Sequence, residues 1–266
     1  MELIILLAAG AVAGTAAGLL GIGGGVIIVP VLSLVFASQA VDESILIKVA
    51  VGTSLATIMV TAFSSVWAHH RKRAVQWPLV KIMVQGVVVG SFIGAWIADW
   101  MPALWLTIAF ILFLIGVSLQ MAIGPVQGDK ELPGHWGLRS VSCIVGAISA
   151  MMGIGGGALH VPFLSWRGVP VKQSIATSAA IGLPLAIAST IGFILTGLDE
   201  TGLPENSIGY VNLPAFAGVV VASTLFAPLG ARLAHRLPDK ILKKTFSVFL
   251  FLLALQMIYE LILKNS

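Results

Sequence analysis

Six apolar segments of this 266-residue chain are each long enough to cross a lipid bilayer as a helix, which leaves few folds open. A spanning helix needs about 20 apolar residues, because the hydrocarbon layer is about 30 Å thick. In lipid, the backbone polar groups of such a segment must bond to one another, which a helix achieves. The sequence therefore predicts an all-α polytopic membrane protein. The six segments are 45–68, 78–98, 102–123, 173–196, 211–231 and 238–262.

The composition excludes most soluble classes of protein. Only 10% of the residues are charged, against about 25% in a typical soluble domain, and the mean hydropathy is +1.02. The net charge of +4 comes from basic residues in short clusters between apolar segments, as in cytoplasmic loops. We interpret these clusters as topology signals and expect no nucleic-acid partner. Cys143 is the only cysteine, so an intrachain disulfide is excluded.

Two glycine-rich motifs interrupt the remaining apolar segments and reveal an internal repeat. Residues 21–30 read GIGGGVIIVP and residues 153–162 read GIGGGALHVP, a separation of 132 residues. Each motif joins two shorter apolar pieces, 3–20 with 22–37 and 138–152 with 154–166, which indicates broken or re-entrant helices. Further matches follow downstream of each motif. We predict a duplication made of a first repeat, 1–123, a linker, 124–137, and a second repeat, 138–266, within one transmembrane domain.

The charges of the connecting loops predict that the two repeats are inverted. Loop 69–77 holds three Lys or Arg residues, whereas its equivalent, 197–209, holds three acidic residues and no Lys or Arg. Loop 97–103 holds Asp99 and no Lys or Arg, whereas its equivalent, 231–244, holds five basic residues. Because Lys and Arg are enriched in cytoplasmic loops, matching loops should lie on opposite sides of the membrane.

An inverted duplication requires an odd number of crossings in each repeat. Three full spans plus a Gly-rich helical hairpin satisfy this condition, and so do five spans of which one is short. We favour the broken or re-entrant hairpin, because segment 158–166 has nine residues, about 14 Å as a helix. Both termini are then expected to face the periplasm.

The paired G-x-G-G-G-x-x-x-x-P motifs, each followed by a Thr-Ser pair, resemble those of the TauE/SafE sulfite exporter family. The resemblance covers essentially the whole chain. It implies a permease of the bacterial inner membrane that moves sulfur-containing anions such as sulfite, sulfoacetate, other organosulfonates or thiosulfate. Export, as opposed to import, is implied by the resemblance alone. An anion channel, or a permease of the same fold for thiosulfate or another organic anion, is the alternative.

The glycine motifs are the expected anion site. Glycine lets backbone N–H groups approach a ligand closely, and a helix that begins after such a turn presents free N–H donors and the positive end of its dipole. The alternative is that the glycines only permit tight helix crossings. A nucleotide-binding fingerprint is excluded, because Val26 and Ala158 stand where it requires glycine. The glycines expected to cradle the anion near the bilayer midplane are Gly23, Gly24, Gly25, Gly155, Gly156 and Gly157.

Hydroxyl and basic side chains recur at matching positions after each motif. Hydroxyls can solvate an anion without burying a charge, although they can equally bond to the backbone or join neighbouring helices. The matched lysines are expected to attract anions from opposite sides of the membrane, or else to snorkel at helix ends. The hydroxyl residues are Thr53, Ser54, Thr177 and Ser178, and the lysines are Lys48 and Lys172.

His160 is the ionisable side chain that we place deepest in an apolar segment. An intramembrane histidine is a candidate for carrying a coupling proton or for pairing with the anion. Alternatively, it is a neutral histidine bonded to a backbone carbonyl. We find no nucleophile paired with a base, no ATP-binding motif and no metal-ligand spacing. The expected protein is therefore not an enzyme and needs no metal or cofactor. A coupling proton or cation and a homo-oligomer stay open.

Overall fold

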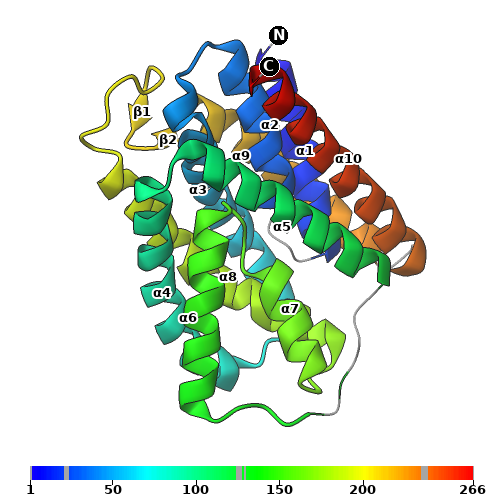
Figure 1. Cartoon of the computed structure of the whole chain (residues 1–266). Helices are drawn as coiled ribbons and strands as arrows, with labels where there is room; N and C mark the ends of the chain where they lie inside the picture. Colours follow the sequence, from blue (N-terminus) through cyan, green and yellow to red (C-terminus); the bar gives the residue numbers. More distant parts are fainter. Residues whose placement is uncertain (1, 21–23, 124–127, 129, 235–238, 266) are drawn as a thin grey trace.

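The computed structural model describes residues 2–20, 24–123, 128, 130–234 and 239–265 (Figure 1). The described residues form ten helices and one two-stranded hairpin. The first five helices are α1 (Glu2–Leu20), α2 (Gly25–Ser38), α3 (Glu43–Arg71), α4 (Trp77–Trp100) and α5 (Ala103–Ile123). The next are α6 (His135–Met151), α7 (Gly157–Trp166) and α8 (Val171–Thr196). The strands β1 (Ser207–Ile208) and β2 (Val211–Asn212) then precede α9 (Leu213–Ala234) and α10 (Asp239–Asn265).

The predicted all-α membrane fold is confirmed at the level of helix content and length. Among the described residues, α3, α4, α8 and residues 103–120 of α5 are long and apolar enough to span a bilayer. The other two predicted spans are helical as α9 and α10, and their described apolar stretches run over 213–227 and 247–263. Each predicted span therefore corresponds to one helix.

Local chemistry explains where several of these helices begin. The Asp42 side chain accepts hydrogen bonds from the Ser44 N–H at 2.8 Å and the Ser44 hydroxyl at 2.7 Å, which caps α3. These bonds lower the pKa of Asp42. Pro78 lies in the first turn of α4, where no intrahelical N–H is needed. Gly24 has a positive φ of 76°, a left-handed conformation that turns the chain into α2.

The first helix of each half packs on the fourth helix of the other half. On α4, Gly86, Gly90 and Gly94 face the backbone of α6, and on α1, Gly10 and Gly14 face the backbone of α9. A β-carbon on Gly90 would lie 2.9 Å from the Cα of Cys143, so only glycine permits this approach. Small residues at four-residue spacing are how membrane helices pack closely. The two halves therefore interlock.

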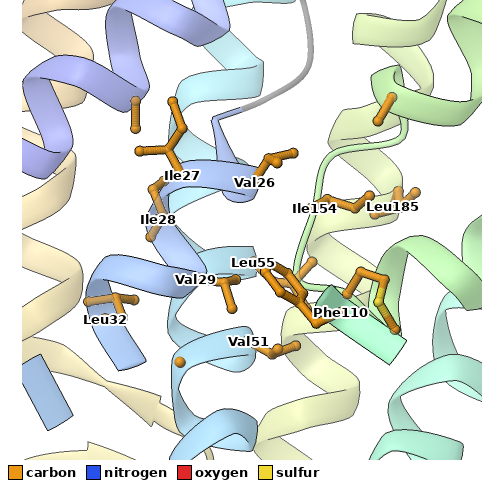
Figure 2. Packing of buried hydrophobic residues seen from close by; sticks show 14 of the residues in the cluster. Val26, Ile27, Ile28, Val29, Leu32, Val51, Leu55, Phe110, Ile154 and Leu185 are labelled. Carbon is orange, nitrogen blue, oxygen red and sulfur yellow. The ribbon is translucent and has the colours of Figure 1, made fainter. Parts of the chain in front are cut away.

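The two long central helices, α3 and α8, pack against each other in the middle of the bundle. The short helix α2 packs on α3, and α7 packs on α8. Figure 2 shows side chains of α2 and α3 converging with Ile154 and Leu185 in the apolar core between them. At one side α5 lies along α10, where the hydroxyls of Ser118 and Ser247 each donate to the other's carbonyl oxygen at 2.8 Å.

The second helix of each half is too short to cross the membrane alone. The 14 residues of α2 span about 21 Å and the 10 residues of α7 about 15 Å, against a hydrocarbon layer of about 30 Å. Helix α2 lies near the end of the bundle where α1 begins, and α7 lies toward the opposite end (Figure 1). The C-terminal end of α10 and the β1–β2 hairpin lie at the same end of the bundle as the start of α1.

Candidate functional site

The two glycine turns contact each other in the middle of the bundle. A β-carbon on Gly25 would lie 2.9 Å from the Cα of Ile154, so the start of α2 touches the α6–α7 turn directly. Gly153 has a positive φ of 64°, and a β-carbon there would lie 3.0 Å from the Cα of Val51 on α3. The Ser54 hydroxyl donates to the Gly153 carbonyl at 2.8 Å. The predicted motifs are therefore adjacent in space.

Gly24 and Gly25 form the described part of the first turn, and Gly23 lies outside the described residues. The Gly24 carbonyl accepts from the Ile27 N–H at 3.0 Å, which closes the first turn of α2. A β-carbon on Gly24 would lie 2.9 Å from the Ala13 carbonyl oxygen, and its left-handed φ would strain any L side chain. Both the lack of space for a β-carbon and the left-handed backbone conformation therefore require glycine at position 24.

A small cavity lies beside the second glycine turn. It has a volume of about 20 Å³, enough for about one water molecule. The cavity lies between α3, α8 and the start of α7, and α1 closes it through Ala17. The lining residues that carry backbone donors or hydroxyls are Gly155, Gly156, Gly157, Ser178, Thr61 and Ser65.

The Ser178 hydroxyl is the unsatisfied polar group of this cavity. Ser178 is fully buried, and its Oγ has no hydrogen-bond partner among the described residues. Leaving a buried hydroxyl unpaired costs about 1–3 kcal/mol, so a ligand or water is expected there. The first N–H groups of α7 begin at Gly157 on the same wall, and helix-starting N–H groups have no intrahelical partner. The cavity therefore offers hydrogen-bond donors to an acceptor.

His160 lies one turn into α7 and is fully buried. Its Nδ1 lies 2.9 Å from the Gly156 carbonyl oxygen, so Nδ1 must carry the proton that it donates there. Its Nε2 has no partner among the described residues. A β-carbon on Gly156 would lie 2.7 Å from Nδ1, so Gly156 gives the imidazole its space. His160 therefore makes the bond to a backbone carbonyl that is expected of a neutral histidine with a structural role.

Thr53 and Thr177 each accept a hydrogen bond from the other half of the chain, at matching positions. The Asn212 N–H donates to the Thr53 hydroxyl oxygen at 2.9 Å, and the Gln76 N–H donates to that of Thr177 at 3.1 Å. Gln76 and Asn212 are themselves separated by the 136-residue repeat shift. Each threonine therefore holds the connection that precedes the fourth helix of the other half. Neither threonine lines the cavity, so the structure separates them from Ser178.

The two matched lysines have different surroundings. Lys172 is exposed at the start of α8. Lys48 is 9% exposed, with its Nζ 3.8 Å from Asp99 Oδ1, and it also donates to the Asp99 carbonyl. The charge of Lys48 is therefore compensated by Asp99, a pairing that the repeat pattern does not reveal.

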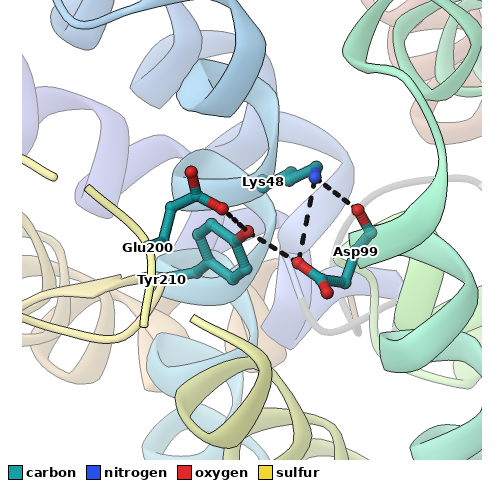
Figure 3. A network of polar contacts seen from close by, with 4 residues as sticks. All are labelled: Lys48, Asp99, Glu200 and Tyr210. Atoms are coloured by element: carbon teal, nitrogen blue, oxygen red, sulfur yellow. Dashed lines mark hydrogen bonds and ion pairs between the residues drawn. The ribbon is translucent and has the colours of Figure 1, made fainter. Parts of the chain in front are cut away.

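Tyr210 adds a polar contact that sequence reasoning missed (Figure 3). Its hydroxyl oxygen lies 2.6 Å from Asp99 Oδ1 and 2.9 Å from Glu200 Oε2. Burial raises the pKa of Tyr210, and the two carboxyl groups raise it further, because all three effects disfavour a phenolate. Tyr210 stands where the first repeat has Ala74, so the repeat gives no signal for it. Within the described part of the chain, no group of three or more His, Cys, Asp or Glu residues has metal-binding geometry.

Comparison with known proteins places the chain in a family. The model of the family described as sulfite exporter TauE/SafE matches residues 6–257. A probable membrane transporter protein of Haemophilus influenzae is 35% identical over 257 residues, which cover 96% of this chain and 97% of that protein. The probable membrane transporter protein YunE of Bacillus subtilis is 28% identical and covers 98% of each chain.

A third relative comes from an archaeon. The probable membrane transporter protein MJ0441 of Methanocaldococcus jannaschii is 27% identical over 96% of this chain and 94% of its own length. No solved structure matches the chain significantly. The family match and the relatives extend over nearly the whole length, and the fold is a bundle of apolar helices. The chain is a multi-pass membrane protein that belongs to the TauE/SafE sulfite exporter family.

Proposed function

We propose that this protein is a secondary transporter that exports a sulfur-containing anion, such as sulfite, sulfoacetate or another organosulfonate, across the bacterial inner membrane. Membership of the TauE/SafE family and the transporter names of its relatives support this proposal. The observation that carries it is the small cavity that is lined both by Ser178, whose buried hydroxyl has no partner among the described residues, and by the start of α7. The described volume holds about one water, so the cavity would have to widen for the anion to bind there.

The cavity suits an oxyanion because it offers hydrogen-bond donors. Its lining residues include no cationic side chain. The Ser178 hydroxyl and the first N–H groups of α7 can each donate to an anionic oxygen, and the positive end of the α7 dipole favours negative charge. Ser54, the matching residue, already donates to Gly153, so the two halves differ in their readiness to bind. Gly24 and Gly25 would contribute when the first half takes the role of the second.

Alternating access is supported by the matched contacts of the two halves. Five helices in each half, the α1–α9 and α4–α6 pairs, and the Thr53 and Thr177 bonds all recur in equivalent positions. We infer that the halves are inverted repeats, 1–123 and 138–266, with α2 and α7 as half-membrane hairpin arms. A transporter of this design exposes a fixed site to each side by rocking one part against another.

The charges of the connections support one orientation in the membrane. The acidic α8–α9 connection would lie in the periplasm with both termini, and the basic connection after α3 would lie in the cytoplasm. Lys172, at the start of α8, would then attract anions from the cytoplasmic side. Lys48 would lie at the opposite side, and its charge is compensated by Asp99.

Ser178→Ala tests the site in counterflow assays with purified protein in proteoliposomes. Loss of one hydrogen bond to a charged ligand costs about 1.5–3 kcal/mol, so the half-saturating anion concentration should rise by about tenfold or more. Ser189→Ala is the matched control, because Ser189 is equally buried and unpaired on α8 and does not line the cavity. Equal half-saturation in both variants would remove Ser178 from the site.

A further inference from the structure

Lys and Arg residues gather at one end of the bundle, which we call the basic end. It is formed by the end of α3, the starts of α4, α6 and α8, and the end of α7 (Figure 1). Residues 44–98 and 132–198, which contain these elements, include no Asp or Glu. Among the described residues of the basic end, Glu131 is the acidic one. The basic ones include Arg71, Arg73, Lys81, Lys130, Arg139 and Arg167.

Tryptophan side chains lie against several of these cations. The Arg71 Cζ lies 4.1 Å from the ring centroid of Trp67, and the Arg139 Cζ lies 4.8 Å from that of Trp136. Both indoles are exposed. Tryptophan is enriched at the membrane–water interface, where its ring lies at the level of the lipid headgroups. The cations of the basic end therefore lie at headgroup level.

Trp166, at the end of α7, is contacted by two cations at once. The Lys130 Nζ lies 4.4 Å from its ring centroid, and the Arg167 Cζ lies 5.1 Å from it. The two charges are therefore no further apart than the Debye length at 0.1 M salt, which is about 10 Å. Neither cation has a carboxylate partner among the described residues. Two neighbouring like charges attract an anion more strongly than either charge alone.

Backbone contacts hold the described part of the linker on the end of α7. The Gly128 N–H donates to the Ser165 carbonyl at 3.2 Å, and the Arg167 Nη1 donates to the Glu131 carbonyl at 3.1 Å. A β-carbon on Gly128 would lie 3.1 Å from the Trp166 Cδ1, so the linker lies directly beside the indole. The bond to the Glu131 carbonyl uses one of the five N–H donors of the guanidinium. The corner therefore keeps several charged donors for a ligand.

We propose that Lys130, Trp166 and Arg167 bind the phosphate headgroup of an anionic phospholipid. The two cations donate to the phosphate oxygens, and the indole packs beside the glycerol. Phe163 lies one turn earlier on the same face of α7, with its ring centroid 5.8 Å from the Arg167 Cζ. Its ring continues the apolar surface from the indole toward the acyl chains. This site does not rest on the proposed transport function.

Native mass spectrometry of the full-length protein in detergent tests the site. The protein is titrated with phosphatidylglycerol and, separately, with zwitterionic phosphatidylcholine. Lys130→Gln combined with Arg167→Gln removes both charges. The dissociation constant of the first bound phosphatidylglycerol should then rise by about tenfold or more, because each cation contributes to binding an anionic lipid. The dissociation constant of phosphatidylcholine should stay the same.

Arg73→Gln combined with Lys81→Gln is the matched control. It removes the same charge from exposed side chains of the basic end that make no described contact with an aromatic ring. In detergent there is no charged bilayer surface, so cations that do not touch the bound lipid should contribute little. The control should therefore bind phosphatidylglycerol like the wild-type protein. An equal loss in the two double variants would show attraction to net charge and would overturn the site.

Thermal unfolding separates lipid binding from misfolding. Phosphatidylglycerol should raise the Tm of the wild-type protein and of the control, but not that of the Lys130–Arg167 double variant, because a ligand stabilises the folded state to which it binds. The Tm of each variant without lipid checks its fold. Trp166→Leu should weaken phosphatidylglycerol binding more than Trp166→Phe, which keeps a ring. Displacement of phosphatidylglycerol by inorganic phosphate would assign the corner to a free anion and refute the proposal.

Discussion

Gly156→Ala should destabilise the protein through His160. The added β-carbon would lie 2.7 Å from His160 Nδ1 and 3.3 Å from Leu185 Cδ1, and the first distance is shorter than real contacts allow. The imidazole must therefore move and lose its 2.9 Å bond to the Gly156 carbonyl. Loss of a buried hydrogen bond costs about 1–3 kcal/mol, and overpacking costs a similar amount. We expect a loss of about 2 kcal/mol in the free energy of unfolding.

Thermal unfolding in detergent measures this loss, which corresponds to about 4–8 °C in Tm for a protein of this size. Gly116→Ala on α5 is the matched control, because its β-carbon would meet nothing within 4 Å. Alanine is the better helix former, so Tm should stay or rise in that variant. A double-mutant cycle with His160→Ala isolates the collision. If Gly156→Ala costs as much without the imidazole as with it, our account of this contact is wrong.

Two further changes test the packing of the halves and the buried phenol. Gly90→Leu should lower Tm by several degrees relative to Gly116→Leu, because the β-carbon at position 90 would lie 2.9 Å from the Cα of Cys143 on α6. Equal Tm values in the two variants would contradict close packing of α4 on α6. Tyr259→Phe leaves Tyr210 as the single tyrosine, and its pKa is raised by burial and by two carboxyl groups. The ultraviolet signal of its phenolate should therefore appear at higher pH in the folded than in the denatured protein, which titrates near 10. Because the unfolded chain loses this proton first, its contribution to stability is intact below about pH 10 and falls above it; coincident titrations would refute the burial of the phenol.

The helices could be predicted from the sequence because they follow from local properties of the chain. The apolar segment 78–98 became Trp77–Trp100, since apolar length and the proline in the first turn act locally. The two glycine motifs were expected to meet, and Gly25 does contact the 153–154 backbone. The repeated motif thus marked positions that come together in the fold, and their binding of an anion stays a prediction.

The particular bonds of each polar residue could not be predicted, because they depend on where the other half of the chain lies. Ser54 and Ser178 occupy equivalent positions, yet among the described residues only Ser54 has a partner. Thr53 accepts a hydrogen bond from a residue 159 positions away, which no local pattern indicates. Tyr210 stands where the first repeat has Ala74, so no repeated pattern marks its contact with Asp99.

Counterflow into proteoliposomes that contain the wild-type protein tests the central claim most directly. Sulfite, sulfoacetate, thiosulfate, taurine, sulfate and phosphate compete in parallel at two pH values. A carrier for sulfur-containing anions predicts inhibition by sulfite or by an organosulfonate and none by phosphate. An anion current without counterflow, or equal inhibition by phosphate, would contradict it.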